Sequence, residues 1–330
     1  MYLSAERIAV ANKAIQDTFE QTSIAWQAIP HWDTGDPAQT RVRSDSAYAP
    51  LDDMGPLGES PVAIVPFTRY FYLTVAQATS PTPDAMLDAV IARTVQLARD
   101  VDAKVIGELV EKSQPAPGDI ATNAKPAKLL NGLIEARAAL ENAGYRAPSC
   151  LLTDTGGLKA ISQLDTGYPV LQPLLDAANV NSRYRVDNLQ KPDGDTGVDE
   201  PKKADGDKGV DEPKKADGDT GVDEPKKPDE DKGVDEPGED DGVSFATGVS
   251  GKRKPNDNGK MLLLGRRRRI AHGGAAGTSP GEEPVDLAIS VPPSLEVIGE
   301  TKRGYIELAV RIRFAPRITD KNGVVGVVIS

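Results

Sequence analysis

Residues 82–111 read TPDAMLDAVIARTVQLARDVDAKVIGELVE and contain the longest uninterrupted helical pattern of the chain. Thr82 suits the N-cap, Pro83 suits the first helical position, and Asp84 places a negative charge in the first turn. The apolar positions that recur at helical spacing are Leu87, Val90, Ile91, Val95, Ala98, Val101, Val105, Ile106 and Leu109. Such a helix is about 45 Å long. We therefore predict a spine on which other elements pack; one long helix of a bundle is the alternative.

The chain before the spine predicts an N-terminal helix and then an extended excursion. Residues 4–28 carry apolar side chains at loosely helical spacing. Short strands at 40–43 and 62–65, followed by the aromatic and β-branched run FTRYFYLTV at 67–75, predict a long hairpin with a flexible tip at 52–58. Because an isolated two-stranded hairpin is marginal in water, we expect another chain to hold it.

The chain after the spine predicts a compact mixed α/β unit. Helices are expected over 126–144, 155–161 and 168–178, and strands over 149–153, 184–186, 261–264, 285–291, 295–298, 303–314 and 324–329. The strand at 303–314 has the clearest alternation of the chain. Its predicted buried face holds Ile306, Leu308, Val310, Ile312 and Phe314, and its other face holds Glu307, Arg311 and Arg313.

Residues 191–241 differ from the rest of the chain in composition. Four copies of a twelve-residue unit begin at Lys191, Lys203, Lys215 and Lys227, each close to KPDGDTGVDEPK. The net charge of −11 comes entirely from this segment, so the remainder of the chain is formally neutral. One Val per copy offers too little apolar surface to offset the entropy of ordering. We predict a disordered acidic insert that acts as a solvated spacer.

The insert also resembles part of a calcium-binding loop in its spacing of Asp193, Asp195 and Asp199. The full EF-hand pattern is absent, because the position that would carry its bidentate Glu is Ala204. The spacer interpretation is therefore favoured over a calcium site, and the sequence predicts no cofactor.

The residues that carry most enzyme chemistry are scarce. Cys150 is the only cysteine and lies in an apolar run, which favours a buried, inert thiol. His31 and His272 are the only histidines and lie far apart, so a zinc site has almost no ligands. The chain has neither a phosphate-binding glycine loop nor a Gly-x-Ser-x-Gly elbow. No apolar run approaches the roughly 20 residues that span a bilayer, so no membrane partner is expected.

One cluster of charge qualifies as a candidate site. Arg266, Arg267, Arg268 and Arg269 form a run directly after the strand at 261–264. Arginine clusters bind nucleic-acid phosphates. The same run can pair with carboxylates of a neighbouring subunit if the strand continues through it. Both contacts remain open from the sequence.

The order of these elements resembles the capsid fold shared by tailed-phage major capsid proteins and encapsulins. The resemblance covers the whole chain except the insert. It is carried by residues 60–73, which lead into the spine at 83–84, by 149–154 with 168–171, and by the strand at 307–314.

The resemblance implies an α+β, Hong Kong 97-type capsid fold and a structural, non-enzymatic subunit that assembles with many copies of itself into an icosahedral shell. The implied parts are an N-terminal arm (1–30), an extended loop (31–75), a peripheral domain with the spine (76–125), an axial domain in two parts (126–190 and 242–300) around the insert (191–241), and return strands of the peripheral domain (301–330).

Two members of this family differ in what they enclose. A phage capsid packs DNA and lies in the virion after assembly in the host cytoplasm, whereas an encapsulin encloses a cargo enzyme in a cytoplasmic nanocompartment. The absence of a long extension before the arm favours an encapsulin or a phage with a separate scaffold protein. The repeat insert favours a phage capsid. A soluble enzyme that carries the insert is a third alternative.

Overall fold

The computed structural model describes residues 3–44, 61–116, 125–165, 167–187, 189, 259–268 and 280–329. Residues 193–255 separate from the rest of the chain as a second unit and lie outside the described residues. The predicted loop tip at 52–58, the insert with its aspartates, His272 and Arg269 lie outside them as well. Those predictions stay predictions.

The long helix α4, Asp84–Lys112, confirms the predicted spine. Its 29 residues correspond to about 43 Å. The helix begins one residue later than predicted, with Pro83 and not Thr82 at the N-cap. The buried stripe is also rotated: Ile91 is exposed, whereas Thr94 and Leu97 are buried. Thr94 is compatible with burial because its hydroxyl donates to the Val90 carbonyl.

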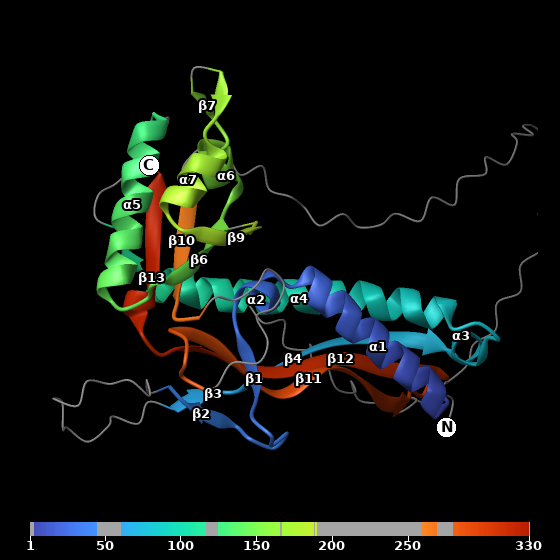
Figure 1. The fold of residues 1–330 in the computed structure, drawn as a ribbon. Helices are drawn as coiled ribbons and strands as arrows, with labels where there is room; N and C mark the ends of the chain where they lie inside the picture. Colours follow the sequence, from blue (N-terminus) through green and yellow to red (C-terminus); the bar gives the residue numbers. More distant parts are fainter. Residues whose placement is uncertain are drawn as a thin grey trace, which may run out of the picture. The chain divides into compact units, whose positions relative to one another are not determined.

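Helix α4 packs against a four-stranded sheet in the order β1-β11-β12-β4 (Figure 1). The strands are β1 (His31–Asp33), β11 (Val285–Glu300), β12 (Tyr305–Ile318) and β4 (Val65–Thr74). Strand β1 is parallel to β11, and the other two pairs are antiparallel. The predicted alternation of β12 is confirmed, because all five residues of its apolar face are buried. The two strands predicted at 285–298 form one strand, whose register shifts at Pro292 and Pro293 because proline cannot donate to the ladder.

A five-stranded sheet in the order β5-β13-β10-β6-β9 carries the second core. Its strands are β5 (Gln114–Pro115), β13 (Val324–Ile329), β10 (Gly259–Arg266), β6 (Ala147–Thr153) and β9 (Val180–Arg185). The helices of this core are α5 (Pro126–Asn142), α6 (Thr155–Ile161) and α7 (Leu171–Ala177). Asp154 caps α6 by accepting a hydrogen bond from the Gly157 amide at 2.7 Å, and Gly144 follows α5 at φ +92°, a conformation that glycine allows.

Strand pairing corrects three parts of the predicted domain layout. Strand β11, placed in the axial part at 242–300, pairs in the four-stranded sheet with β12. Strand β13, grouped with the return strands at 301–330, pairs in the five-stranded sheet with β10. Strands β1 and β4 lie within the span assigned to the extended loop, yet both belong to the four-stranded sheet. The pairings of β1 with β11 and of β4 with β12 join residues far apart in the chain, and local sequence periodicity specifies no strand's partner.

The N-terminal segment docks on its own chain. It forms α1 (Ala5–Thr22) and α2 (Ile24–Ala28), which are separated at Ser23. The Asp102 carboxylate of α4 accepts hydrogen bonds from the Ser23 hydroxyl at 2.7 Å, the Ala25 amide at 2.9 Å and the Ile24 amide at 3.0 Å. Burial raises the pKa of Asp102, although these three donors favour its ionised form. One carboxylate of the spine therefore fixes the bend of the arm.

The base of the extended excursion also packs on its own chain. Strands β2 (Arg41–Arg43) and β3 (Pro61–Ala63) pair antiparallel. Val42 and Ile64 form a small cluster with Ala288 of β11 and Ala315 of β12. The expectation that only another chain holds the hairpin is thus wrong for its base. The remaining short elements are α3 (Val75–Thr79), β7 (Leu164–Asp165), β8 (Tyr168–Pro169) and the 3-10 turn η1 (Lys321–Gly323).

We predict that Asp102→Ala lowers the free energy of unfolding by about 2 kcal/mol, because buried donors lose their acceptor. Urea denaturation followed by circular dichroism measures the change. Asp88→Ala, at an exposed position of the same helix, is the matched control and should stay within about 0.5 kcal/mol of the parent. Equal effects of the two substitutions would show that Asp102 does not hold the arm.

Candidate functional site

Arg266 is a buried structural residue and not a surface contact. It ends β10, its side chain is 3% exposed, and its Nη2 donates to the Ala28 carbonyl of α2 at 2.7 Å. The predicted role of Arg266 in nucleic-acid or intersubunit contacts is therefore wrong for this residue. Its position at the end of an almost wholly buried strand turns it inward.

Arg267 contacts groups of its own chain. Its amide donates to Glu283 Oε2 at 2.8 Å, and its guanidinium lies 5.1 Å from the centre of the Tyr145 ring. The Tyr145 hydroxyl donates to Asp320 Oδ2 at 2.7 Å. Burial and this carboxylate raise the pKa of Tyr145 far above its usual range, so Tyr145 stays a neutral donor. Arg267 is thereby linked to the turn between β12 and β13.

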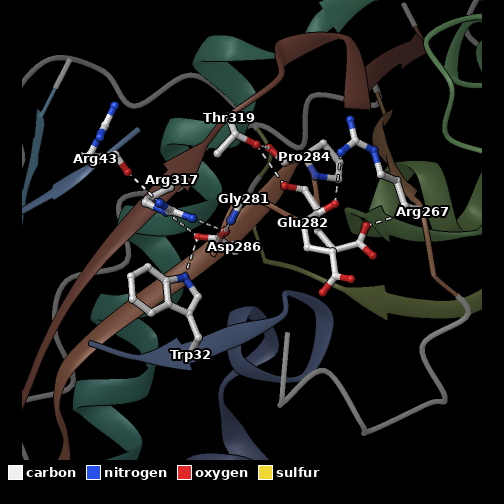
Figure 2. A network of polar contacts seen from close by, with 10 residues as sticks. Trp32, Arg43, Arg267, Gly281, Glu282, Pro284, Asp286, Arg317 and Thr319 are labelled. Atoms are coloured by element: carbon white, nitrogen blue, oxygen red, sulfur yellow. Dashed lines mark hydrogen bonds and ion pairs between the residues drawn. The ribbon is translucent and has the colours of Figure 1, made fainter. Parts of the chain in front are cut away.

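Arg268 is the most exposed of the three described arginines, and 63% of its side chain is accessible to solvent. Its guanidinium forms an ion pair with Glu282, and its amide donates to Glu283 Oε1 at 3.1 Å. Glu283 thus accepts from two consecutive amides of the run, while burial raises the pKa of its carboxyl. Figure 2 shows Arg267 beside Glu282 and the turn that leads into β11. The described arginines of the run therefore bind this turn of the same chain.

A second polar network was not predicted from the sequence. Asp286 and Arg317 are both buried and form two parallel hydrogen bonds of 2.7 and 2.5 Å between β11 and β12. Asp286 also accepts from Trp32 Nε1 at 3.2 Å and from the Gly281 amide at 3.1 Å (Figure 2). The Arg317 guanidinium lies 4.9 Å from the centre of the Trp32 ring. Both oxygens of this buried carboxylate therefore have partners, as a stable buried ion pair requires.

This network also holds the base of the loop. Arg317 Nη1 donates to the Arg43 carbonyl at 2.6 Å. Arg43 is one residue before Ser44, the last described residue ahead of the loop. Arg313 of the same strand donates to the Pro37 and Gln39 carbonyls at 2.6 and 3.2 Å. Two arginines of β12 thus fix the backbone from which the loop departs. The available signal in the sequence was Asp286, a lone charge in the apolar strand VDLAIS.

The described chain presents apolar groups on two exposed surfaces. Tyr70 and Tyr72 of β4 are 55% and 57% exposed on the sheet face opposite the buried Phe71. Leu164 and Tyr168 of the β7–β8 hairpin are 66% and 75% exposed. Large exposed apolar groups that lie close together are a feature of protein interaction sites.

Other kinds of site find little support among the described residues. They contain no group of three or more His, Cys, Asp or Glu side chains that could hold a metal ion. No helix in the described ranges is long and apolar enough to cross a membrane. Cys150 is free and buried, as predicted, and burial raises the pKa of its thiol.

The fold of the described residues, with α4 beside the four-stranded sheet and a separate five-stranded sheet, is similar to two solved structures over nearly the whole chain. A virus-like particle from Pyrococcus furiosus has a TM-score of 0.57 at 12% identity and covers 98% of this chain and 100% of its own. A phage-related protein from Bordetella bronchiseptica RB50 has a TM-score of 0.55 at 10% identity, with 98% and 96% covered. No protein-family model and no curated protein sequence matches. At such identities the likeness shows the fold alone.

We predict that Arg317→Met lowers the free energy of unfolding by about 3–5 kcal/mol, because it leaves the Asp286 carboxylate buried without its cation. Thermal and urea denaturation measure the loss. The double variant Arg317→Met with Asp286→Leu should recover much of the stability, since it removes the uncompensated charge as well.

Glu296→Gln provides the control for this prediction. Glu296 pairs with Arg311 at 2.7 Å on the surface of the same two strands, so its loss should cost less than about 1 kcal/mol. A double variant no more stable than Arg317→Met would contradict the electrostatic account.

Proposed function

We propose that this chain is the structural subunit of a closed shell built from many copies of itself. The observation that carries the proposal is the fold, which matches a virus-like particle over 98% of the chain. Proteins that share a fold often differ in function, so the surfaces of this chain must support the assignment as well. The proposed role is non-enzymatic.

The exposed groups support self-association. Tyr70 and Tyr72 lie on the uncovered end of a sheet face whose other end is covered by the chain's own β2–β3 ribbon. Leu164 and Tyr168 stand on a hairpin with two residues in each strand and little core of its own. Burying these side chains between copies would stabilise the contact by roughly 25 cal/mol for each Å² of apolar surface removed from water.

The finer proposal is a phage major capsid protein that forms an icosahedral virion shell around DNA, with or without a separate scaffold protein. The acidic insert favours this assignment over an encapsulin, because phage capsids often carry loop insertions. The alternative is a cytoplasmic encapsulin shell around a cargo enzyme. Nuclease-protected DNA inside purified particles would support the first assignment, and a co-purifying enzyme inside them would support the second.

We predict that the purified protein forms closed, hollow particles, visible by electron microscopy and as a fast-sedimenting species. Changing Tyr70 and Tyr72 to Lys should reduce assembly at least tenfold, because charges replace apolar contacts, and should leave the circular dichroism spectrum unchanged. Changing both to Phe should preserve assembly. Wild-type protein that stays a monomer or dimer under several salt conditions would refute the shell function.

We predict that Arg268→Gln with Arg269→Gln lowers the yield of particles and leaves the DNA content per particle unchanged, as expected for a contact between subunits. Arg185→Gln, another exposed arginine that pairs with Asp187, is the control. Normal assembly with less retained DNA, most evident at low salt, would instead assign the pair to phosphate contacts. No effect on either measurement would leave the pair as an ordinary solvated surface.

A further inference from the structure

His31 occupies the junction between the N-terminal arm and the four-stranded sheet. It follows α2 after two residues and begins β1, where it pairs with Leu287 of β11. Its imidazole stacks on the Trp26 ring of α2, with ring centres 3.9 Å apart and planes inclined by 30°. Trp26 in turn meets the buried Phe19 of α1 edge-on, with ring centres 5.3 Å apart. Three aromatic rings therefore connect both arm helices to the sheet.

Protonation of the imidazole would be unfavourable at one of its two nitrogen atoms. The His31 Nδ1 atom is buried and has no hydrogen-bond partner in the part of the chain that the structure describes. A doubly protonated ring carries an N–H at both nitrogens, so Nδ1 would become a buried donor without an acceptor. Such a group costs free energy, and the cost is greater when it belongs to a charged ring.

The neighbouring charges do not compensate for this cost. On β1, Asp33 uses its Oδ1 to accept from the Gly35 amide at 2.8 Å. On β11 and β12, Asp286 and Arg317 are bound to each other and contact Trp32, whose side chain points to the other face of β1. The arm helices present the apolar rings to His31, of which Trp26 is the direct neighbour. Within the described ranges, no ion pair joins His31 to any of these groups.

We propose that the His31–Trp26 stack is an acid-sensitive joint that holds the N-terminal arm on the sheet at neutral pH and loosens when His31 takes up a proton. The chain's only other histidine, His272, lies outside the described residues. Burial also raises the pKa of Asp102, at the start of α2, and of Glu283, so variants of His31 must separate its acid response from theirs. The joint belongs to the folded chain itself and holds whether or not the chain assembles into a shell.

The direction of the pH effect follows from linkage. Burial lowers the pKa of His31 below its usual 6.5. This effect outweighs a backbone hydrogen bond with Ile29, which raises the pKa. The unfolded or detached state therefore binds the proton more readily than the docked state. The contribution of the joint is complete above about pH 6.5 and is lost as the pH falls from there through the lower pKa of the docked state. A stacked imidazolium gains some cation–π attraction to Trp26, which reduces the effect.

Tryptophan fluorescence of the full chain tests the proposal. Emission should change reversibly as the pH falls, with a midpoint below 6.5, because the imidazole stacked on Trp26 becomes charged. His31→Phe, which keeps an aromatic ring and does not titrate, should abolish this step. His272→Asn should retain it. Trp26→Phe should remove it and leave only the emission of Trp32.

Hydrogen exchange distinguishes a loosened arm from a mere change in emission. Protection of the α2 amides should fall several-fold below the midpoint in the parent chain and stay constant in His31→Phe. His31→Gln is a second non-titrating variant if the phenylalanine variant does not fold. A step that persists without His31, a midpoint above 6.5 or unchanged α2 protection would each overturn the proposal.

Discussion

The contact between the apolar face of β12 and helix α4 is the constraint on which the remaining elements depend. The alternating residues from Ile306 to Phe314 are buried, and they share one core with the inward stripe of α4. Strand β12 also pairs on both sides, with β11 and with β4, so it fixes the position of each neighbour by its register. The arm helix α1 then packs on α4 and completes the same core. Loss of register along β12 would turn every inward side chain outward, because side chains alternate with a period of two.

Sequence periodicity was a good guide to elements and a poor guide to their partners. The 3.6-residue period of α4 and the two-residue period of β12 are local properties, so both were predicted with bounds within a few residues. The sheet to which a strand belongs depends on its pairing with other strands, which for β1 and β4 lie more than two hundred residues away. Both β11 and β13 were expected as strands, but periodicity does not specify the partner of a strand, so each was grouped with elements of the other sheet. The bend of the arm at Ser23 was missed because its cause, Asp102, lies on another helix.

The same distinction separates the two polar clusters. The run of arginines was conspicuous as a sequence motif, but its described members make contacts within the chain, because Glu282 and Glu283 return beside it. The pair of Asp286 and Arg317 was inconspicuous, because Asp286 is a lone charge in the run VDLAIS and Arg317 is one of three arginines of β12. A buried charge without a partner is costly, so the position of Asp286 in an apolar strand was enough to predict a cation opposite it. Which cation is a matter of register, and Asp286 aligns with Arg317 only in the antiparallel pairing of β11 with β12.

The polar contacts of α2 bear on the proposed loosening of the arm. Helix α2 is too short to be stable alone, and polar groups of three other elements contact it: Asp102 of α4 at its start, Tyr184 of β9 at the Gln27 carbonyl and Arg266 of β10 at the Ala28 carbonyl. Negative charge at the start of a helix and positive charge at its end both favour the helix dipole. These polar contacts are few and directional, and they add to the apolar contacts that α1 and α2 make in the core of the four-stranded sheet, whereas the sheets also have backbone ladders. A change of charge at one contact of α2 therefore acts on the arm first, and the sheets keep their packing.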